Sequence, residues 1–412
     1  MKTKKVRILN LVARIGLFIL ILSLGVIAAL VVGETEGLAL ADLSSASVRA
    51  VATATHGDVL YAALIGGLRP AGIYRSDDSG HTWQLVSSGP VAIKALAVHS
   101  VNDAVLYAGT VGGLAATTDS LWRSDDGGQT WRRFVMSLPA NPDGVLLPVN
   151  ALATDPNQPG VLYVGTDGHG VYRIEDDEGR NSYRLVGGLS LYDAHVNGLV
   201  VGPDSRVYAL TSHGLFVTDG HAWQKLSLPE LAASLAVAAS DPQTLYAGCV
   251  STGAYRTTDG GQTWEPINNG LEMIPGAALR VTALAIDEQN PNHVVAATAY
   301  GVGGQLVPWG IYESHDAGRS WTKLAEADEV VMELTINQGI ISAVKANGLA
   351  RYGEPSRPAP VISLPNFHSL ANPSGIQVLI LILTIGLAGL TLVGQAEWVL
   401  RRDQATARGG QG

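Results

Sequence analysis

Four short stretches of the chain place an aspartate, a glycine and a tryptophan at the same spacing. They fit Ser/Thr-x-Asp-x-Gly-x-Ser/Thr-Trp, and their shared residues are Asp78, Gly80, Trp83, Asp126, Gly128, Trp131, Asp259, Gly261, Trp264, Asp316, Gly318 and Trp321. A carboxylate in a tight turn can accept backbone N–H groups of that turn or ligate a hard cation such as calcium. Because no stretch has the spacing of an EF-hand loop, we assign these aspartate turns to structure and expect neither a metal ion nor a cofactor.

The aspartate turns belong to a longer internal repeat. A shortened copy lies at Val217–Trp223 and a degraded copy at Glu175–Tyr183, which gives six related turns. An apolar stretch such as VLYAGT precedes each turn, and units starting at Val48, Ile93, Val149, Val196, Leu235, Val281 and Val331 recur every 39 to 56 residues. Periods of this size indicate a propeller or a solenoid. Short alternating strands, joined by Gly, Asn and Asp turns without a helical period, favour the β-propeller.

We therefore predict an all-β fold, a seven-bladed β-propeller with six blades that carry an intact or degenerate aspartate turn and one that does not. The seventh unit, Val331–Gly353, has only three strand-like runs. We expect residues near Leu38–Leu43 or Pro360–Leu364 to supply its outer strand, because a strand from outside the unit would close the ring and cover the open edge of this blade.

Two apolar segments flank the repeats and have the length of a membrane-spanning helix. Residues 15–33 follow five basic residues, and residues 376–394 precede Arg401 and Arg402. The positive-inside rule places both termini in the cytoplasm and the propeller on the extracytoplasmic side of the cell membrane. The expected organisation is a basic tail (1–14), a spanning helix (15–33), a tether or closing strand (34–47), the propeller (48–353), a proline-rich tether (354–375), a second spanning helix (376–394) and a cytoplasmic tail (395–412).

The N-terminal segment has a second interpretation. Ala39-Leu40-Ala41 offers the small-residue pattern of a signal peptide cleaved after Ala41. The apolar stretch is longer than the roughly 7 to 15 residues usual in such peptides, which favours an uncleaved anchor.

The outer part of the chain is strongly acidic. Between residues 34 and 356 it has 18 Lys and Arg against 34 Asp and Glu. This charge argues against nucleic acid and anionic lipid as ligands, and it suits basic partners, cations or neutral sugars. Cys249 is the single cysteine, so no disulfide forms within the chain and packing must supply its stability.

Loops that depart from the repeat are the candidates for a binding face, opposite the aspartate turns. Their polar and aromatic residues are Arg69, Asp119, Asp143, Glu272, Arg280, Tyr300 and Trp309. A propeller hydrolase needs two carboxylates facing each other across a cleft, and no pair here is singled out by spacing, so no catalytic residue is assigned. The ten histidines are scattered, and His169 and His213 fit repeated turn positions better than metal ligation.

The aspartate turns resemble the Asp-box, or bacterial neuraminidase repeat, of sialidases, sortilin-type receptors, propeller glycosidases and the photosystem II stability and assembly factor family. The resemblance covers about residues 48–353. It implies a β-propeller but no one activity, because these families do unrelated work. A sialidase would need an arginine triad, a Tyr/Glu nucleophile pair and an acidic Asp. The Arg-Ile-Pro signature is missing, and Arg75, Arg123, Arg173 and Arg256 recur at one repeat position, so the resemblance is to a member without the sialidase site.

Two functions from different classes follow from these observations. The favoured one is a membrane-anchored scaffold for protein interaction or assembly, with another membrane or envelope protein as partner. The alternative is a carbohydrate-binding or glycoside-hydrolase-type surface protein with a glycan ligand. Two carboxylates about 5 to 10 Å apart in a deep cleft would favour the hydrolase, and a shallow or filled centre would favour the scaffold.

Overall fold

The computed structural model divides the chain into two compact units, one of which spans Gly37–Glu354. The structure describes residues 38–39, 46–54, 59–67, 70–78, 82–90, 92–111, 120–134, 148–176, 182–186, 195–337, 339–345 and 348–352. Both predicted spanning segments lie outside these residues. Within the described ranges there is no helix with the length and apolar character that a membrane crossing requires.

Seven antiparallel sheets, here called blades 1 to 7, follow one another along the described chain. Blade 1 contains β1 (Leu38–Ala39), β2 (Ala46–Thr53), β3 (Leu60–Gly67), β4 (Gly72–Ser76) and β5 (Thr82–Ser87). Blade 2 contains β6 (Ile93–His99), β7 (Asn102–Thr110), β8 (Leu121–Ser124) and β9 (Arg132–Arg133), and blade 3 contains β10 (Val149–Thr154), β11 (Val161–Thr166), β12 (Val171–Glu175) and β13 (Ser182–Leu185).

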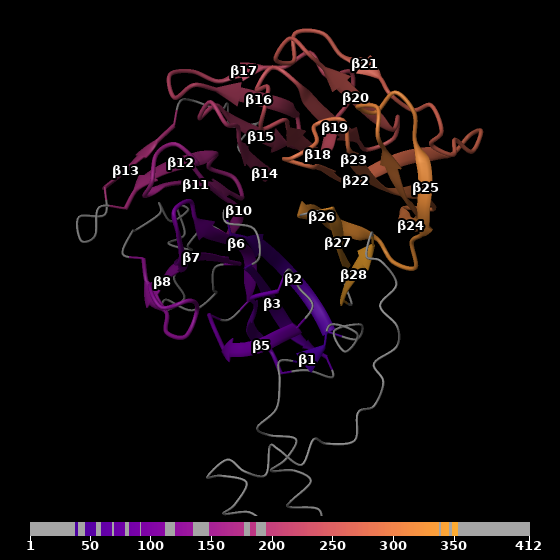
Figure 1. The fold of residues 1–412 in the computed structure, drawn as a ribbon. Coiled ribbons are helices and arrows are strands. Elements are labelled where there is room, and N and C mark those ends of the chain that lie inside the picture. Colours follow the sequence, from indigo (N-terminus) through magenta and orange to yellow (C-terminus); the bar gives the residue numbers. More distant parts are fainter. Residues whose placement is uncertain are drawn as a thin grey trace, which may run out of the picture. The chain divides into compact units, whose positions relative to one another are not determined.

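The other four blades continue the same meander. Blade 4 contains β14 (Val196–Val201), β15 (Val207–Thr211), β16 (Gly214–Thr218) and β17 (Gln224–Lys225), and blade 5 contains β18 (Ala232–Val237), β19 (Leu245–Cys249), β20 (Ala254–Thr257) and β21 (Glu265–Pro266). Blade 6 contains β22 (Ala278–Ile286), β23 (Val294–Val302), β24 (Gln305–Ser314) and β25 (Thr322–Glu326), and blade 7 contains β26 (Val331–Asn337), β27 (Ile340–Lys345) and β28 (Gly348–Tyr352). The blades follow one another around a ring, so that blade 7 contacts β2 of blade 1 (Figure 1). The predicted seven-bladed β-propeller is confirmed.

The apolar core lies between the blades. Seven clusters of buried side chains each combine residues from two neighbouring blades. One of them joins the two ends of the ring, because Val344 and Leu349 of blade 7 pack with Trp83 and Tyr74 of blade 1. Each sheet buries both faces against its neighbours, which explains why its strands read as nearly continuous apolar runs.

The aspartate turns connect the third and fourth strands of their blades. In blade 6, Asp316 accepts the Ser320 backbone N–H at 2.8 Å and the Ser320 hydroxyl at 2.5 Å, while Ser314 Oγ donates to it at 2.8 Å. The hydrogen bond from the Ser320 hydroxyl, followed by that from its backbone N–H, lowers the pKa of Asp316 to about 2. Gly318 has φ +81°, a conformation that glycine adopts without strain. Asp78, Asp126 and Asp259 accept the same backbone bond, and Gly80 lies outside the described residues.

The turn tryptophans pack against the preceding blade. Trp321 of blade 6 belongs to the cluster shared with blade 5, and its indole N–H donates to the Ile267 carbonyl at 2.6 Å. Trp83 of blade 1 is 1% exposed and fills the closing interface with blade 7. The turn therefore fixes its own loop and also supplies an anchor between blades.

The outer strand expected for blade 7 is not supplied by the N-terminal segment. Leu38 and Ala39 pair with Trp83 and Thr82, so β1 extends blade 1 and not blade 7. The expectation is wrong for these two residues because the open edge of β5 offers them a backbone ladder, and Pro360–Leu364 lie outside the described residues. The described part of blade 7 has three strands, and the ring closes through side-chain packing.

We expect Trp83→Ala to cost about 3 to 5 kcal/mol of unfolding free energy, because it opens a cavity at the closing interface. The matched control is Trp264→Ala, since Trp264 occupies the same turn position in blade 5 but is only half-buried and should cost less. Denaturant unfolding of the purified chain followed by tryptophan fluorescence measures both. Equal losses would show that the closing interface carries no special share of the stability.

Candidate functional site

The innermost strands of all seven blades surround a central cavity of about 400 Å³. Every one of them has a β-bulge, and the bulged residues are Arg49, Lys94, Asn150, Asn197, Ala233, Thr282 and Met332. All of these except Asn150 line the cavity. A bulge turns its side chain away from the regular pleat, so this repeated irregularity decides what the channel presents. Each unit start predicted from the sequence is the residue directly before a bulge. Leu235 is the exception, because the residue before the blade 5 bulge is Ala232.

Hydrogen bonds between blades hold the channel wall. Lys94 Nζ donates to Asn150 Oδ1 at 2.5 Å, and Asn150 Nδ2 donates to the Val196 carbonyl at 3.3 Å, which links blades 2, 3 and 4. Ser234 Oγ donates to the Val281 carbonyl at 3.2 Å and links blades 5 and 6. Polar side chains beside the channel are therefore partly engaged in keeping the blades together.

Glu333 is the one carboxylate among the described residues that line the cavity. Burial within the ring raises its pKa to about 7, although the channel leaves the side chain partly exposed, so that water reaches it. Acid–base hydrolysis by a carboxylate pair needs a second carboxyl group facing the first. The described lining therefore supplies half of such a pair.

Four of the seven predicted binding-face residues lie in described parts of the chain, and Arg69, Asp119 and Asp143 lie outside them. The structure brings Glu272, Tyr300 and Trp309 together. Trp309 Nε1 donates to Glu272 Oε2 at 2.7 Å, the Tyr300 hydroxyl donates to the Glu272 carbonyl, and the two rings meet edge to face at 5.1 Å. Arg280 lies in β22 opposite Ala299, and no described contact joins it to this group.

Lys323 completes the Glu272 group, and the sequence analysis did not select it. Its ammonium lies 3.5 Å from Glu272 Oε2 and 5.0 Å from the centre of the Trp309 ring. It lies in β25, far along the chain from Glu272. Its position in the repeat has no sequence feature that would single it out. Contacts of this kind depend on which strands the fold places side by side.

An exposed apolar surface adjoins this group. Met273, Ile274, Val302, Leu306 and Val307 are 51%, 42%, 57%, 37% and 43% exposed. We call them the blade 5–6 patch. They are half of the ten large exposed hydrophobic residues found among the described residues, and all lie on the connector between β21 and β22 or at the tip of the β23–β24 hairpin. Exposed apolar residues are usually scattered, so their concentration at one place makes this surface a candidate for binding.

The β23–β24 hairpin is longer than its equivalents, with strands of nine and ten residues against five and four in β19 and β20. Val307 pairs with Tyr300, and Val302 lies two residues further, so these three side chains share one face of the hairpin, whereas Leu306 lies on its other face. The backbone N–H of Ile274 donates to the Tyr300 hydroxyl at 3.3 Å, which ties this face to the connector. The tertiary structure thus assembles the patch from two separate insertions.

The recurring arginines have local partners. Arg75 forms an ion pair with Asp77 at 2.6 Å, and Arg123 forms ion pairs with Asp125 at 2.6 Å and with Asp176 at 2.5 Å. Arg173 pairs with Glu175 and Arg256 with Glu265. Each arginine therefore has a role inside its own blade or at a blade interface.

The structure also assembles His293, Glu313 and His315, which the sequence analysis did not select. One ligand atom from each lies within 4.8 Å of the others, at the blade 6 end opposite the blade 5–6 patch. The only sequence signal was the His-Asp pair inside the blade 6 aspartate turn.

Comparison with known proteins agrees with the fold. The BNR/Asp-box repeat family matches residues 122–133 and 255–266, which contain the aspartate turns of blades 2 and 5. No curated protein matches the chain.

Several solved structures are similar in fold. They include the GH74 enzyme of Niastella koreensis (TM-score 0.45, 13% identity, 75% of this chain covered), an extracellular domain assigned to a hybrid two component system of B. thetaiotaomicron (TM-score 0.55, 14% identity, 78% covered) and YCF48 bound to D1 peptide (TM-score 0.54, 16% identity, 78% covered). The chain spans 64% of the first protein, 40% of the second and 97% of YCF48. At these identities the likeness concerns the fold alone.

The raised pKa of Glu333 predicts a pH dependence of stability. Between about pH 4.3 and 7 the unfolded chain loses this proton while the folded chain keeps it, so unfolding becomes easier as the pH rises. We expect Glu333→Gln to be more stable than the unsubstituted chain above pH 7, by at most about 4 kcal/mol, and to differ little below pH 4.5.

Denaturant unfolding at pH 4.5, 6, 7 and 8 measures this difference. The exposed Glu288→Gln is the control for removing any one carboxylate. If the unfolding free energies of Glu333→Gln and Glu288→Gln change with pH in parallel, the channel does not raise the pKa of Glu333.

Proposed function

We propose that this chain, a seven-bladed BNR/Asp-box β-propeller, is an extracytoplasmic interaction and assembly module held at the cell membrane by its terminal segments. The observation that carries the proposal is the blade 5–6 patch, which exposes five large apolar side chains on two insertions of the repeat. Soluble surfaces rarely gather apolar residues in this way unless another molecule covers them.

The patch favours a polypeptide partner. Its apolar residues stand beside aromatic and charged side chains, with Tyr300, Trp309 and Lys323 packed around Glu272. Such a mixture of an apolar centre and a polar rim is typical of protein interfaces. The contacts among these side chains also hold the connector and hairpin together, so the surface needs little ordering when a partner binds.

The charge of the outer part indicates which partner would bind best. With 18 basic against 34 acidic residues between 34 and 356, the propeller attracts positively charged surfaces. We therefore propose a segment of another membrane or envelope protein that presents apolar side chains flanked by Lys or Arg. YCF48, a protein of similar fold, is seen with a bound peptide, so a propeller of this kind can present a peptide site.

The glycoside-hydrolase alternative has less support. The described lining of the channel contributes Glu333 as its only carboxylate, whereas the hydrolase mechanism needs a facing pair. Glu272 and Glu326 both contact the Lys323 ammonium, at 3.5 and 2.8 Å, but neither carboxylate lines the described cavity, and Glu272 is also bonded to Trp309.

The sequence supports the membrane location. Residues 15–33 and 376–394 are apolar segments of spanning length whose basic flanks agree on one topology. Short tethers at both ends would keep the propeller near the bilayer, where a membrane protein is the accessible partner.

We expect a photo-crosslinking residue at position 302 to join the chain, in intact membranes, to a peptide with apolar residues and a basic flank. The control position is Val101, which is 54% exposed in a turn of blade 2, away from the patch. Mass spectrometry of the crosslinked peptides identifies the partner segment. Met273→Ser with Val307→Ser should reduce the crosslinks severalfold, and higher salt should reduce them further because it screens the charge attraction.

Equal crosslinking from positions 302 and 101, or crosslinks from 302 that survive the double substitution unchanged, would refute the docking site. Specific retention of a glycan on an array, lost in Glu272→Gln, would instead favour the carbohydrate-binding alternative.

The topology has a separate test. Cys249 is buried, and burial raises the pKa of its thiol to about 12, so it gives little background with maleimides. We expect an impermeant maleimide to label His221→Cys on intact cells, because this side chain is 89% exposed, and to label Thr3→Cys only after permeabilisation. Labelling of Thr3→Cys on intact cells would invert the topology, and its loss even after permeabilisation would indicate cleavage of the N-terminal segment.

A further inference from the structure

Blade 6 departs from the repeat at three positions that lie together. In blades 1, 2 and 5 the second strand carries a tyrosine opposite an arginine of the third, and the pairs are Tyr61 with Arg75, Tyr107 with Arg123 and Tyr246 with Arg256. In blade 6 the same pair is Val295 with Glu313. The arginine has thus been replaced by an acid in this blade alone among those with an intact aspartate turn.

Two histidines accompany this change. His315 occupies the second position of the aspartate turn, where the other intact turns have Asp77, Asp125 and Thr258. His293 directly precedes Val294, which pairs with Ser314, the first residue of the blade 6 turn. The residues that occupy the equivalent position in blades 1, 2 and 5 are Val59, Val105 and Thr244. Blade 6 therefore has a histidine at a buried or partly buried position where these blades have valine or threonine.

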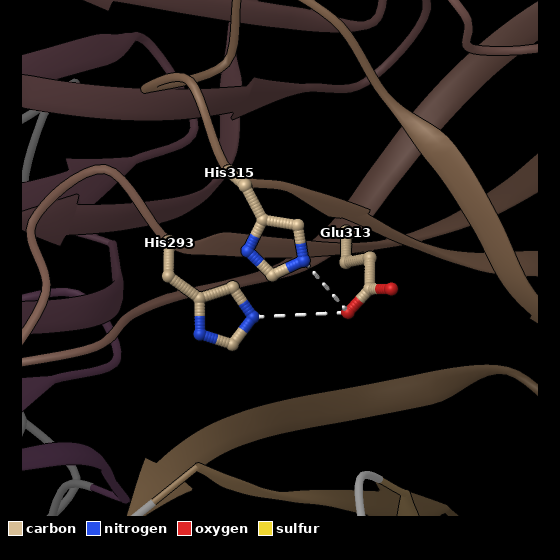
Figure 2. A group of neighbouring side chains, drawn as sticks. All are labelled: His293, Glu313 and His315. Carbon is tan, nitrogen blue, oxygen red and sulfur yellow. Dashed lines mark ion pairs between the residues drawn. The ribbon is translucent and has the colours of Figure 1, made fainter.

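The three side chains converge (Figure 2). His293 Nε2 lies 3.8 Å and His315 Nε2 lies 3.6 Å from Glu313 Oε2, and the two imidazole rings stack with centroids 4.7 Å apart. A Zn²⁺ ion binds imidazole nitrogen and carboxylate oxygen at about 2.0 to 2.2 Å. Because no pair of ligand atoms is more than 4.8 Å apart, displacements on the order of 1 Å with reorientation of the rings would bring all three to one ion.

The environment of His293 points to a ligand. This residue is 7% exposed, and its Nε2 atom is buried without a hydrogen-bond partner. Its Nδ1 atom faces Asp287 Oδ2 at 3.3 Å, and Asp287 is held in turn by the Gln289 backbone N–H at 2.9 Å. A carboxylate on one ring nitrogen orients the histidine and leaves the other nitrogen free to bind a metal.

We propose that His293, Glu313 and His315 form a binding site for a divalent metal ion of the zinc class, with Asp287 as a positioning residue. Two imidazoles and one carboxylate suit zinc, cobalt, nickel or copper better than calcium or magnesium. His315 is 66% exposed, so the ion would keep an open position toward solvent for water or for a side chain of another molecule.

The site would join the turn before β23 to the aspartate turn of the same blade. It lies at the opposite end of β23 from Val302 of the blade 5–6 patch, so it is separate from the proposed docking function. The metal site therefore does not depend on the proposed docking function.

The test is zinc and cobalt binding by the purified full chain, prepared without a polyhistidine tag. We expect one equivalent of zinc per chain after dialysis, measured by inductively coupled plasma mass spectrometry. We also expect Co²⁺ to give visible d–d absorption without a strong thiolate band, because Cys249 is buried. Zinc should raise the unfolding temperature of the chain, since it binds the folded state.

The variants restore what other blades contain, which favours normal folding. His315→Thr introduces the blade 5 residue at an exposed position, and it should abolish stoichiometric zinc retention without changing the unfolding temperature of the metal-free chain. Asp287→Asn should weaken zinc binding by about 10- to 100-fold. The control is His221→Ala, because His221 is an exposed histidine beside Asp219 with no third metal ligand found among the described residues, and this variant should bind zinc normally.

A chain that retains no zinc or cobalt after dialysis would overturn the proposal. Full retention by His315→Thr and by Glu313→Gln would also overturn it, because the bound metal would then lie elsewhere. His293→Val, which introduces the residue of blades 1 and 2, should also abolish zinc retention. If this variant fails to fold, the comparison of zinc retention by His315→Thr and His221→Ala still tests the site.

Discussion

Apolar packing between consecutive blades is the interaction on which the rest of this structure depends. A four-stranded sheet of short strands cannot bury its two faces alone, and each of the seven core clusters combines residues from two blades. The ring closes by the same means, with Trp83 set against Val344 and Leu349. Stability is therefore distributed around the ring, and no disulfide is needed.

The aspartate turn contributes to this packing while leaving other positions free to change. In blade 6 its carboxylate is satisfied by Ser314 and Ser320, its glycine supplies the positive φ, and its tryptophan packs on blade 5. The residue between Ser314 and Asp316 takes no part in these contacts. This freedom explains how one repeat can hold a histidine where others hold Asp or Thr without loss of the turn.

The two ends of blade 6 carry different chemistry for the same reason. The strands of the blade are fixed by their neighbours, so the hairpin tip can lengthen at one end and the turns can vary at the other. The tip and the adjoining connector expose Met273, Val302 and Val307, whereas the opposite end holds His293 and Glu313. A rigid ring thus separates an apolar surface from a polar cluster within one sheet.

The sequence by itself determined the all-β class, the number of blades and the aspartate turns, because these follow from a repeated local pattern. It also singled out Glu272, Tyr300 and Trp309 as departures from that pattern. Only the tertiary structure decided that Lys323 completes their group, that β1 joins blade 1, and that His293 meets Glu313 and His315. The physical reason is that these contacts join different strands, where register, bulges and the packing of blades set the distances and the period of the repeat does not.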